Sequence, residues 1–403
     1  MQWPETGQPI DSTAGSMQPC MLDPQLQPDL DRSAAARVFI LADDLTGACD
    51  SGAAFLAAGR AVRVVLNLAG TSPKLSHAEA VLAFTTETRN LSSGEAALRV
   101  ARAVDHLRIA PSGHILFKKI DSAARGHPGV ETMAALNASG AALALVAPAF
   151  PQAGRTVRGG FLSIRDAAAQ DTTIALLDLF PSVEAARIDS LPAAAEAALE
   201  QGIARALASG IRVLLCDSQT QADLDRLATA ASRLRQPILW TGSAGLARAL
   251  AATLPPLRRG ETIPFPHRDG RTLLFVGTDH PVTTLQVSRL EGHCQAPDRA
   301  IHRVNWTSPS HDEIREAFAA SPTAALVLTG GETAAFVLEA LDAASILLAG
   351  ELGPGIPWGI IEGGVADGCV VVTKSGGFGS RDALVHVFDC CSHIHHRRAC
   401  APA

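Results

Sequence analysis

Ile115-Leu-Phe-Lys-Lys-Ile-Asp-Ser-Ala-Ala-Arg-Gly-His-Pro-Gly129 changes within a few residues from apolar to highly polar. Its apolar start, 115–117, has the length of a strand, and Gly126, Pro128 and Gly129 then delay any helix until about residue 130. Ligands of open α/β sheets bind beyond the carboxyl ends of strands. The polar part of this stretch is therefore a candidate binding site.

The charged side chains of the stretch suit a small polyhydroxy acid. We expect Lys119 and Arg125 to hold a carboxylate, Arg125 through two parallel hydrogen bonds, while Asp121 accepts hydrogen bonds from hydroxyls. Arg155, in the proline-rich loop 148–156, is a further candidate to face an anion. The alternative interpretation of the stretch is a surface loop with a solvated ion pair.

The composition limits the class of protein. A chain of 403 residues is too long for one ordinary core, and its 47% hydrophobic content indicates a well-filled globular protein. A net charge of -6 with 4% aromatic residues argues against a nucleic-acid partner. Without an apolar run of about 18 residues or a signal peptide, we expect a cytoplasmic protein that binds no membrane, and its eight cysteines as reduced thiols.

Apolar runs alternate with helix-like segments along the chain, which predicts βαβ units. The predicted fold class is α/β, with two Rossmann-like domains, mostly parallel sheets, and the active site in the cleft between the domains. The segment 255–270 is rich in Pro, Arg and Gly and marks the boundary. The predicted parts are a disordered leader (1–36), a first domain (37–254), a linker (255–270), a second domain (271–389) and a flexible tail (390–403).

Two adjacent carboxylates, Asp43 and Asp44, follow the predicted strand 37–42 and form a concentrated negative site. Thr46 is the expected cap of a small-residue helix over 48–58. The alternative interpretation is that the two aspartates cap that helix.

Three glycine-containing turns in the second domain, 277–281, 329–334 and 374–379, predict a phosphate site. Glycines let the backbone approach phosphate oxygens, and Lys374 adds a positive charge. The turns match neither GxxxxGK[ST] nor GxGxxG. Together with the acid-binding first domain, they suggest phosphoryl transfer across a cleft.

Five motifs, in the same order over 37–389, resemble those of the four-carbon acid sugar kinase family. They are Leu41-Ala-Asp-Asp-Leu-Thr-Gly-Ala48, Lys119-Ile-Asp-Ser122 with Arg125-Gly126, Pro148-Ala-Phe-Pro151 with Gly154-Arg-Thr156, Thr329-Gly-Gly-Glu-Thr333 and Lys374-Ser-Gly-Gly-Phe-Gly379. The resemblance implies a first domain that binds the acid sugar and a second that binds ATP. It also implies transfer to the terminal hydroxyl of a threonate, erythronate or 3-oxo-tetronate, with Mg²⁺ bridging the phosphates.

Carried over position by position, the resemblance implies two sets of contacts. The expected acid-sugar contacts are Asp43, Asp44, Lys119, Asp121 and Arg125, to which we add His127 and Arg155, and Asp44 is the expected acceptor of the hydroxyl proton. The expected nucleotide contacts are Thr278, Gly330, Gly331, Glu332, Thr333, Lys374, Ser375, Gly376, Gly377 and Gly379. We expect no dedicated metal cage.

Two stretches depart from the family pattern. Ser122-Ala-Ala-Arg-Gly-His127 stands where the family has Ser-Thr-Leu-Arg-Gly-Asn, and Gly277-Thr-Asp-His280 replaces its Gly-Ser-x-Ser turn. The identity of the acid sugar is therefore open. The sequence also leaves open whether the protein forms a homo-oligomer. The alternative function is an acid-sugar-binding protein or sensor with weak or no kinase activity. A nicotinamide-dependent oxidoreductase ranks last, because the glycine-rich dinucleotide motif is missing.

Overall fold

The computed structural model describes residues 37–66, 81–107, 113–165, 171–180, 188–255, 270–293 and 299–392, so the predicted leader and nearly all of the predicted linker lie outside the described residues. The strands are β1 (Arg37–Ala42), β2 (Val62–Val65), β3 (Val81–Thr85), β4 (His114–Lys119), β5 (Leu143–Ala147), β6 (Arg155–Arg158), β7 (Phe161–Ile164), β8 (Thr172–Ala175), β9 (Ile188–Leu191), β10 (Val213–Cys216), β11 (Ile238–Gly242), β12 (Arg271–Val276), β13 (Arg299–Arg303), β14 (Thr323–Thr329), β15 (Ser345–Glu351), β16 (Pro357–Glu362) and β17 (Val370–Lys374). The helices are α1 (Leu45–Ala57), α2 (Ser93–His106), α3 (Pro128–Ser139), α4 (Glu196–Ala208), α5 (Gln221–Ser232), α6 (Ala244–Thr253), α7 (Pro281–His293), α8 (His311–Ala319), α9 (Gly331–Ala340) and α10 (Ala383–Ser392).

Fourteen of these strands form one sheet, in the order β13-β12-β14-β17-β16-β15-β2-β3-β1-β4-β11-β5-β10-β9. Its pairs are parallel except at β15 and β16, where three successive antiparallel pairings join two parallel sets. The prediction of a mostly parallel α/β fold is confirmed. The prediction of a separate sheet for each half was wrong, because the unpredicted strands β15 and β16 connect them. Strands β6, β7 and β8 form a second, antiparallel sheet.

Both faces of the sheet are buried, as parallel strands usually require. Successive side chains of a strand point to opposite faces. On β12, Leu273 and Phe275 belong to the large core cluster, whereas Leu274 and Val276 belong to a smaller cluster that includes side chains of α7 and α10. The alternation along one strand therefore separates two hydrophobic cores.

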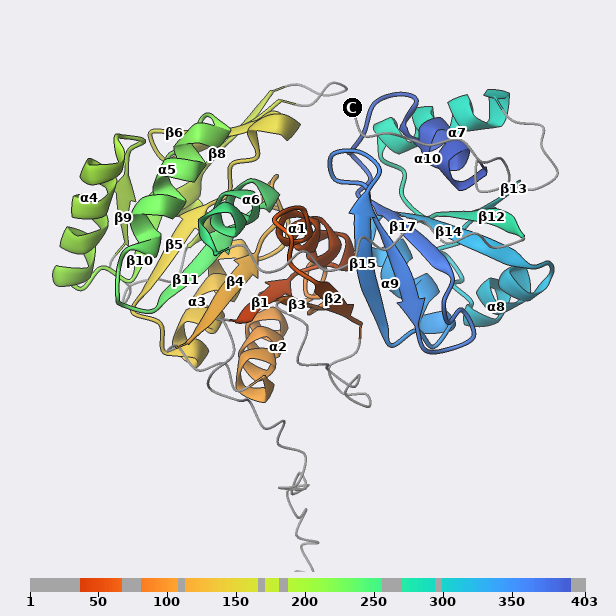
Figure 1. Ribbon diagram of the computed structural model, residues 1–403, viewed down its shortest axis with the longest axis horizontal. Helices are drawn as coiled ribbons and strands as arrows, with labels where there is room; N and C mark the ends of the chain where they lie inside the picture. The colour runs from red at the N-terminus through yellow and green to blue at the C-terminus, as the bar shows by residue number, and fades with distance from the viewer. Residues whose placement is uncertain are drawn as a thin grey trace, which may run out of the picture. The chain divides into compact units, whose positions relative to one another are not determined.

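Helix α1 lies at the centre of a row of helices. In the order α4-α5-α6-α1-α9-α8, each helix contacts the next. Figure 1 shows α1 and α6 on one side of strands β1, β3 and β4, with α2 and α3 on the other. A Cβ atom on Gly52 would lie only 2.8 Å from the Leu348 side chain and 2.9 Å from that of Val62. Small residues thus let α1 approach both β2 and β15.

The start of α1 differs from the prediction. Asp44 is the N-cap, and its Oδ1 accepts a hydrogen bond from the Gly47 amide at 2.8 Å. Thr46 lies within the helix and donates from its hydroxyl to Asp44 Oδ2 at 2.8 Å. The prediction of Thr46 as the cap was wrong, and the alternative is confirmed for Asp44. A short carboxylate reaches the free amides of a first turn readily.

The described chain ends in α10, which continues past the predicted start of the tail at residue 390. Its face carrying Leu384, Val387, Phe388 and Cys391 is buried in the smaller core, which keeps the helix intact to Ser392. Within the ranges that the structure describes, no helix is both long and apolar enough to cross a membrane.

Lys118 and Glu131 form an ion pair inside the protein, between β4 and α3. The Lys118 Nζ–Glu131 Oε2 distance is 2.7 Å, and the side chains are 0% and 1% exposed. Removing one partner of a buried pair leaves an uncompensated charge. We expect Lys118→Met to lower the free energy of unfolding by about 3–5 kcal/mol, measured by urea denaturation. The double variant Lys118→Met/Glu131→Leu should recover most of this loss, and an equal loss in both variants would contradict the explanation.

Candidate active site

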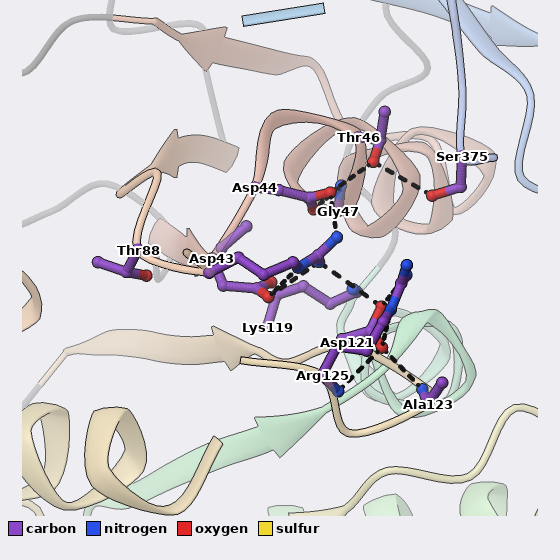
Figure 2. Close-up of polar contacts among 12 residues, drawn as sticks. Asp43, Asp44, Thr46, Gly47, Thr88, Lys119, Asp121, Ala123, Arg125 and Ser375 are labelled. Carbon is purple, nitrogen blue, oxygen red and sulfur yellow. Dashed lines mark hydrogen bonds and ion pairs between the residues drawn. The ribbon is translucent and has the colours of Figure 1, made fainter. Parts of the chain in front are cut away.

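Polar side chains gather at the carboxyl ends of three adjacent strands, β3, β1 and β4 (Figure 2). Asp43 and Asp44 directly follow β1, Asp121 follows β4, and Arg89 lies in the segment after β3. Parallel strands bring their carboxyl ends to one edge of a sheet, so residues far apart in the sequence meet there. This is the edge on which the sequence predicted a site.

Arg89 binds all three carboxylates. Its guanidinium nitrogens lie 2.8 Å from Asp43 Oδ2, 2.7 Å from Asp44 Oδ2 and 3.6 Å from Asp121 Oδ1. Burial would lower the pKa of Arg89, but the attraction of Asp44, Asp43 and Asp121 outweighs it and raises the pKa above its usual range. Arg89 was not predicted as a site residue, although it lies in the polar segment that follows the apolar run 81–84, where ligands of open α/β sheets bind.

Arg125 lines the pocket, but its guanidinium is also paired within the protein, which was not predicted. Its Nε and Nη2 donate to the two oxygens of Asp121, at 2.9 and 2.7 Å. Burial would raise the pKa of Asp121, but the hydrogen bond from Arg125 and the charge of Arg89 hold it well below its usual range. The two residues expected to contact substrate are therefore paired with each other, and Asp121 is not a free acceptor for hydroxyls.

Both carboxylate oxygens of Asp44 also accept hydrogen bonds from within the protein. Oδ1 accepts from Gly47, and Oδ2 accepts from Thr46 and Arg89. Burial would raise the pKa of Asp44, but Arg89 and Lys119 outweigh that effect and lower it. A fully hydrogen-bonded carboxylate of lowered pKa accepts a proton poorly. The structure does not favour the proton-accepting role expected for Asp44.

Lys119 remains available for a ligand. It ends β4, is 5% exposed, and its Nζ forms neither an ion pair nor a hydrogen bond with the described residues. Its charge nonetheless lowers the pKa of nearby carboxyls, among them Asp44 and Asp121. Lys119 is thus a buried cation without a close partner of its own among those residues.

A pocket of about 210 Å³ opens over these groups. Residues of 37–254, hereafter the amino-terminal half, provide Asp44, Gly47, Asp50, Arg89, Lys119, Asp121, Ser122, Ala123, Arg125, Phe150, Arg155, Ile164 and Ser243. Residues of 271–389, the carboxy-terminal half, provide His280, Ser375, Gly377 and Phe378. The pocket is therefore lined from both halves of the chain.

Direct contacts join the two halves at this pocket. The hydroxyls of Thr46 and Ser375 lie 3.2 Å apart (Figure 2), and the rings of Phe150 and Phe378 meet edge to face at 5.9 Å. A Cβ atom on Gly331 would lie 2.2 Å from Asp44 Oδ2. Only glycine allows the start of α9 to approach the carboxylate this closely.

The three predicted glycine turns do come together. A Cβ atom on Gly330 would lie 3.4 Å from Thr278 Cβ, and one on Gly376 would lie 3.0 Å from Thr278 Oγ1. In the first turns of α9, Thr333 is buried and Glu332 is exposed. A second hollow, of about 250 Å³, adjoins Thr278 and is lined by Val276, Gly277, Thr278, Asp279, Arg303, Val304, Asn305, Trp306 and Thr307.

Lys374 departs from the expected phosphate contact. It is 0% exposed, and its Nζ donates to the carbonyls of Ser375, Gly376 and Phe378 at 2.9, 3.3 and 3.2 Å. Burial lowers the pKa of Lys374 to about 7. The side chain holds the 374–379 loop in shape rather than lining the pocket, so any effect on a phosphate is transmitted through that loop.

The last two predicted substrate contacts have different positions. His127 precedes α3, places Nε2 2.6 Å from the Leu91 carbonyl and is not among the residues that line the pocket. Arg155 does line the pocket, and its guanidinium also contacts the Ala153 carbonyl. The expectation that His127 contacts substrate is therefore not supported by its position.

Two family models match the chain. Residues 38–250 match a sugar-binding N-terminal domain, and residues 312–384 match a nucleotide-binding C-terminal domain. The protein is thus of the class in which a sugar-binding region precedes a nucleotide-binding region.

Curated relatives specify the family. A D-threonate kinase of Bordetella bronchiseptica is 33% identical over 86% of this chain and 95% of the relative, and one of Cupriavidus necator is 32% identical over 87% and 96%. A 3-oxo-tetronate kinase of Pseudomonas fluorescens is 26% identical over 85% and 94%. The chain belongs to the four-carbon acid sugar kinase family.

Solved structures agree on the fold. A structure from Salmonella typhimurium described as a putative tRNA synthase has a TM-score of 0.67 at 19% identity, over 87% of this chain and 98% of its own. A Haemophilus influenzae protein has a TM-score of 0.63 at 19% identity, over 86% and 98%. At this level of identity the likeness concerns the fold alone.

Arg89→Ala tests the charge balance of the site. It leaves three buried carboxylates without their shared cation, so we expect a loss of about 3–5 kcal/mol in the free energy of unfolding at pH 7. Attraction to Arg89 lowers the pKa values of Asp44 and Asp121, so the wild type loses this contribution as the pH falls through those values. The difference between variant and wild type should therefore shrink in acid.

The matched control for this measurement is Arg102→Ala, which removes an exposed arginine of α2. Urea denaturation from pH 7 to pH 3 provides the comparison. A difference that is constant with pH, or equal to that of the control, would show that Arg89 does not balance these carboxylates.

Proposed function

We propose that this protein transfers the γ-phosphoryl group of ATP to a hydroxyl of a four-carbon acid sugar of the threonate, erythronate or 3-oxo-tetronate type. The observation that carries the proposal is the pocket lined from both halves, with acid-binding groups on one side and the glycine loop 374–379 on the other. We further propose that residues 37–254 and 271–389 act as acid-sugar-binding and nucleotide-binding domains around this pocket.

The size and charge of the pocket support a small acid as the acceptor. About 210 Å³ is below the roughly 300–1,000 Å³ typical of sites for drug-sized ligands. Arg89 and Arg125 are paired with Asp121, whereas Lys119 and Arg155 also line the pocket. We assign the substrate carboxylate to Lys119, whose Nζ has no close partner among the described residues. The far end of the acid would then point toward Ser375 and Gly377.

The nucleotide is proposed to lie along the turns around Thr278, Gly330 and Gly376, which contact one another. The phosphates would approach the glycine loops, where backbone can come close to oxygen atoms. We propose that the base lies in the adjoining hollow beside Trp306, a residue that is 40% exposed and whose indole offers a surface for stacking.

Mg²⁺ is expected with the nucleotide, where it would neutralise charge on the phosphates. In the part of the chain that the structure describes, no group of three or more His, Cys, Asp or Glu side chains could hold a metal ion. The cytoplasmic location and a homo-oligomeric state remain predictions.

The function is tested by coupled ADP release with ATP, Mg²⁺ and a panel of four-carbon acids that covers both configurations at each carbinol carbon. We expect turnover with at least one acid and none with the matching uncharged sugar alcohols, because Lys119 needs a carboxylate partner. Calorimetric binding of an acid without ADP release would instead favour an acid-sugar-binding protein or sensor.

Lys119→Met tests the carboxylate contact. We expect the KM for the acid to rise by about 10-fold or more, since a charge-assisted hydrogen bond is worth about 1.5–3 kcal/mol, while the KM for ATP stays unchanged. Trp306→Ala should raise the KM for ATP and leave the KM for the acid unchanged. Arg158→Met is the control, because it removes an exposed charge outside the pocket and should change neither KM. If Lys119→Met leaves the KM for the acid unchanged, another group binds the carboxylate.

A further inference from the structure

Asp50 lies on the stripe of α1 that borders the pocket. Asp44, Gly47 and Asp50 are spaced three residues apart and all three line the pocket. Residues three or four positions apart share one face of a helix. Thr46, four residues before Asp50, meets Ser375 of the glycine loop, so this face of α1 points at the carboxy-terminal half.

Asp50 differs from Asp44 and Asp121, the other two carboxylates that line the pocket, because it has no hydrogen-bond partner among the described residues. It is 8% exposed, and its Oδ1 is buried without a hydrogen-bond partner among the described residues. Asp44 and Asp121, in contrast, accept hydrogen bonds on both oxygens. Buried polar groups normally find a partner, so a carboxylate that lines a pocket without one points to a ligand.

The charged groups around Asp50 come from several elements. Lys119 of β4 favours its ionised form, as does Arg248 of α6, whereas Glu351 of β15 and Asp44 oppose it. Burial is the largest effect and raises the pKa of Asp50 to about 7. A base that titrates near neutral pH exists in both forms under working conditions and can take up and release a proton.

We propose that Asp50 is the catalytic residue that accepts the proton of the acceptor hydroxyl. The inference rests on the proposed function. The hydroxyl oxygen forms a bond to the γ-phosphorus, the bond from that phosphorus to the β–γ bridging oxygen breaks, and ADP leaves. The hydroxyl proton passes to the Asp50 carboxylate and then to solvent. Lys119 at one end of the acid and Asp50 at the other would orient the acceptor between them.

Asp50→Asn tests the assignment in the full chain with the acid that gives turnover. We expect kcat to fall by on the order of 100-fold, with the KM values for acid and ATP changed less than threefold. Wild-type kcat/KM should decline as the pH falls below about 7, because this ratio reports the protonation of Asp50 in the free enzyme, and this acidic limb should be absent from Asp50→Asn. Ser51→Ala, which removes the neighbouring buried hydroxyl of α1 outside the pocket lining, should keep both kcat and the limb.

Asp50→Ala supplies an independent readout, because truncation leaves space for a small carboxylate. Added formate should restore activity to Asp50→Ala in a concentration-dependent way and should not stimulate the wild type. The assignment would be overturned if Asp50→Asn kept the wild-type kcat and the acidic limb. It would also be overturned if Asp50→Ala were inactive and formate did not restore its activity. These outcomes leave the kinase function intact, whereas a wild type that releases no ADP with any acid refutes the function itself.

Discussion

The attachment of three carboxylates to one guanidinium is the interaction on which the rest of the site depends. The strands β3, β1 and β4 end side by side, and the chain places Asp43, Asp44 and Asp121 at those ends. Buried like charges repel strongly in a medium of low dielectric constant. Arg89 compensates them, which fixes the segment after β3 and allows Asp44 to cap α1. Helix α1 in turn carries the pocket-lining stripe and contacts both halves of the chain.

Internal pairing also determines which groups are left for a ligand. Motif positions alone would assign substrate contacts to every charged residue of the site, yet Arg125 with Asp121, and Asp44 with Arg89, are already satisfied. Lys374 is used in the same way, inside its own loop. What remains at the pocket is one lysine and one aspartate without close partners among the described residues, Lys119 and Asp50. In the proposed function, Lys119 binds the anionic end of the acid sugar and Asp50 meets its hydroxyl end.

Much of the fold and part of the site could be predicted from the sequence. The alternation of apolar runs located the parallel strands, and the strand-end rule located Asp43, Asp44 and Lys119 at one edge. Strands β15 and β16 were missed because their pairing is antiparallel and long-range. In addition, the glycines and prolines around residue 355 are typical of a loop. The partners of Arg125 and Lys374 could not be predicted, since sequence shows which charges exist and not which neighbour neutralises each. Asp50 was passed over because it lies well inside a helix, while its exposure to the pocket depends on what packs around that helix.

The pairing of β2 with β15 has a mechanical consequence. Three backbone residue pairs, Arg63–Leu347, Val64–Ile346 and Val65–Ser345, connect the two parallel sets, and the Arg63 side chain also donates to the Ser345 hydroxyl. Release of product must then be accommodated by elastic bending or torsion of a hydrogen-bonded sheet, and not by free rotation of two bodies around a tether. Such a deformation has a restoring force, so the empty enzyme would return to the contacted geometry between turnovers without any ligand to pull it there.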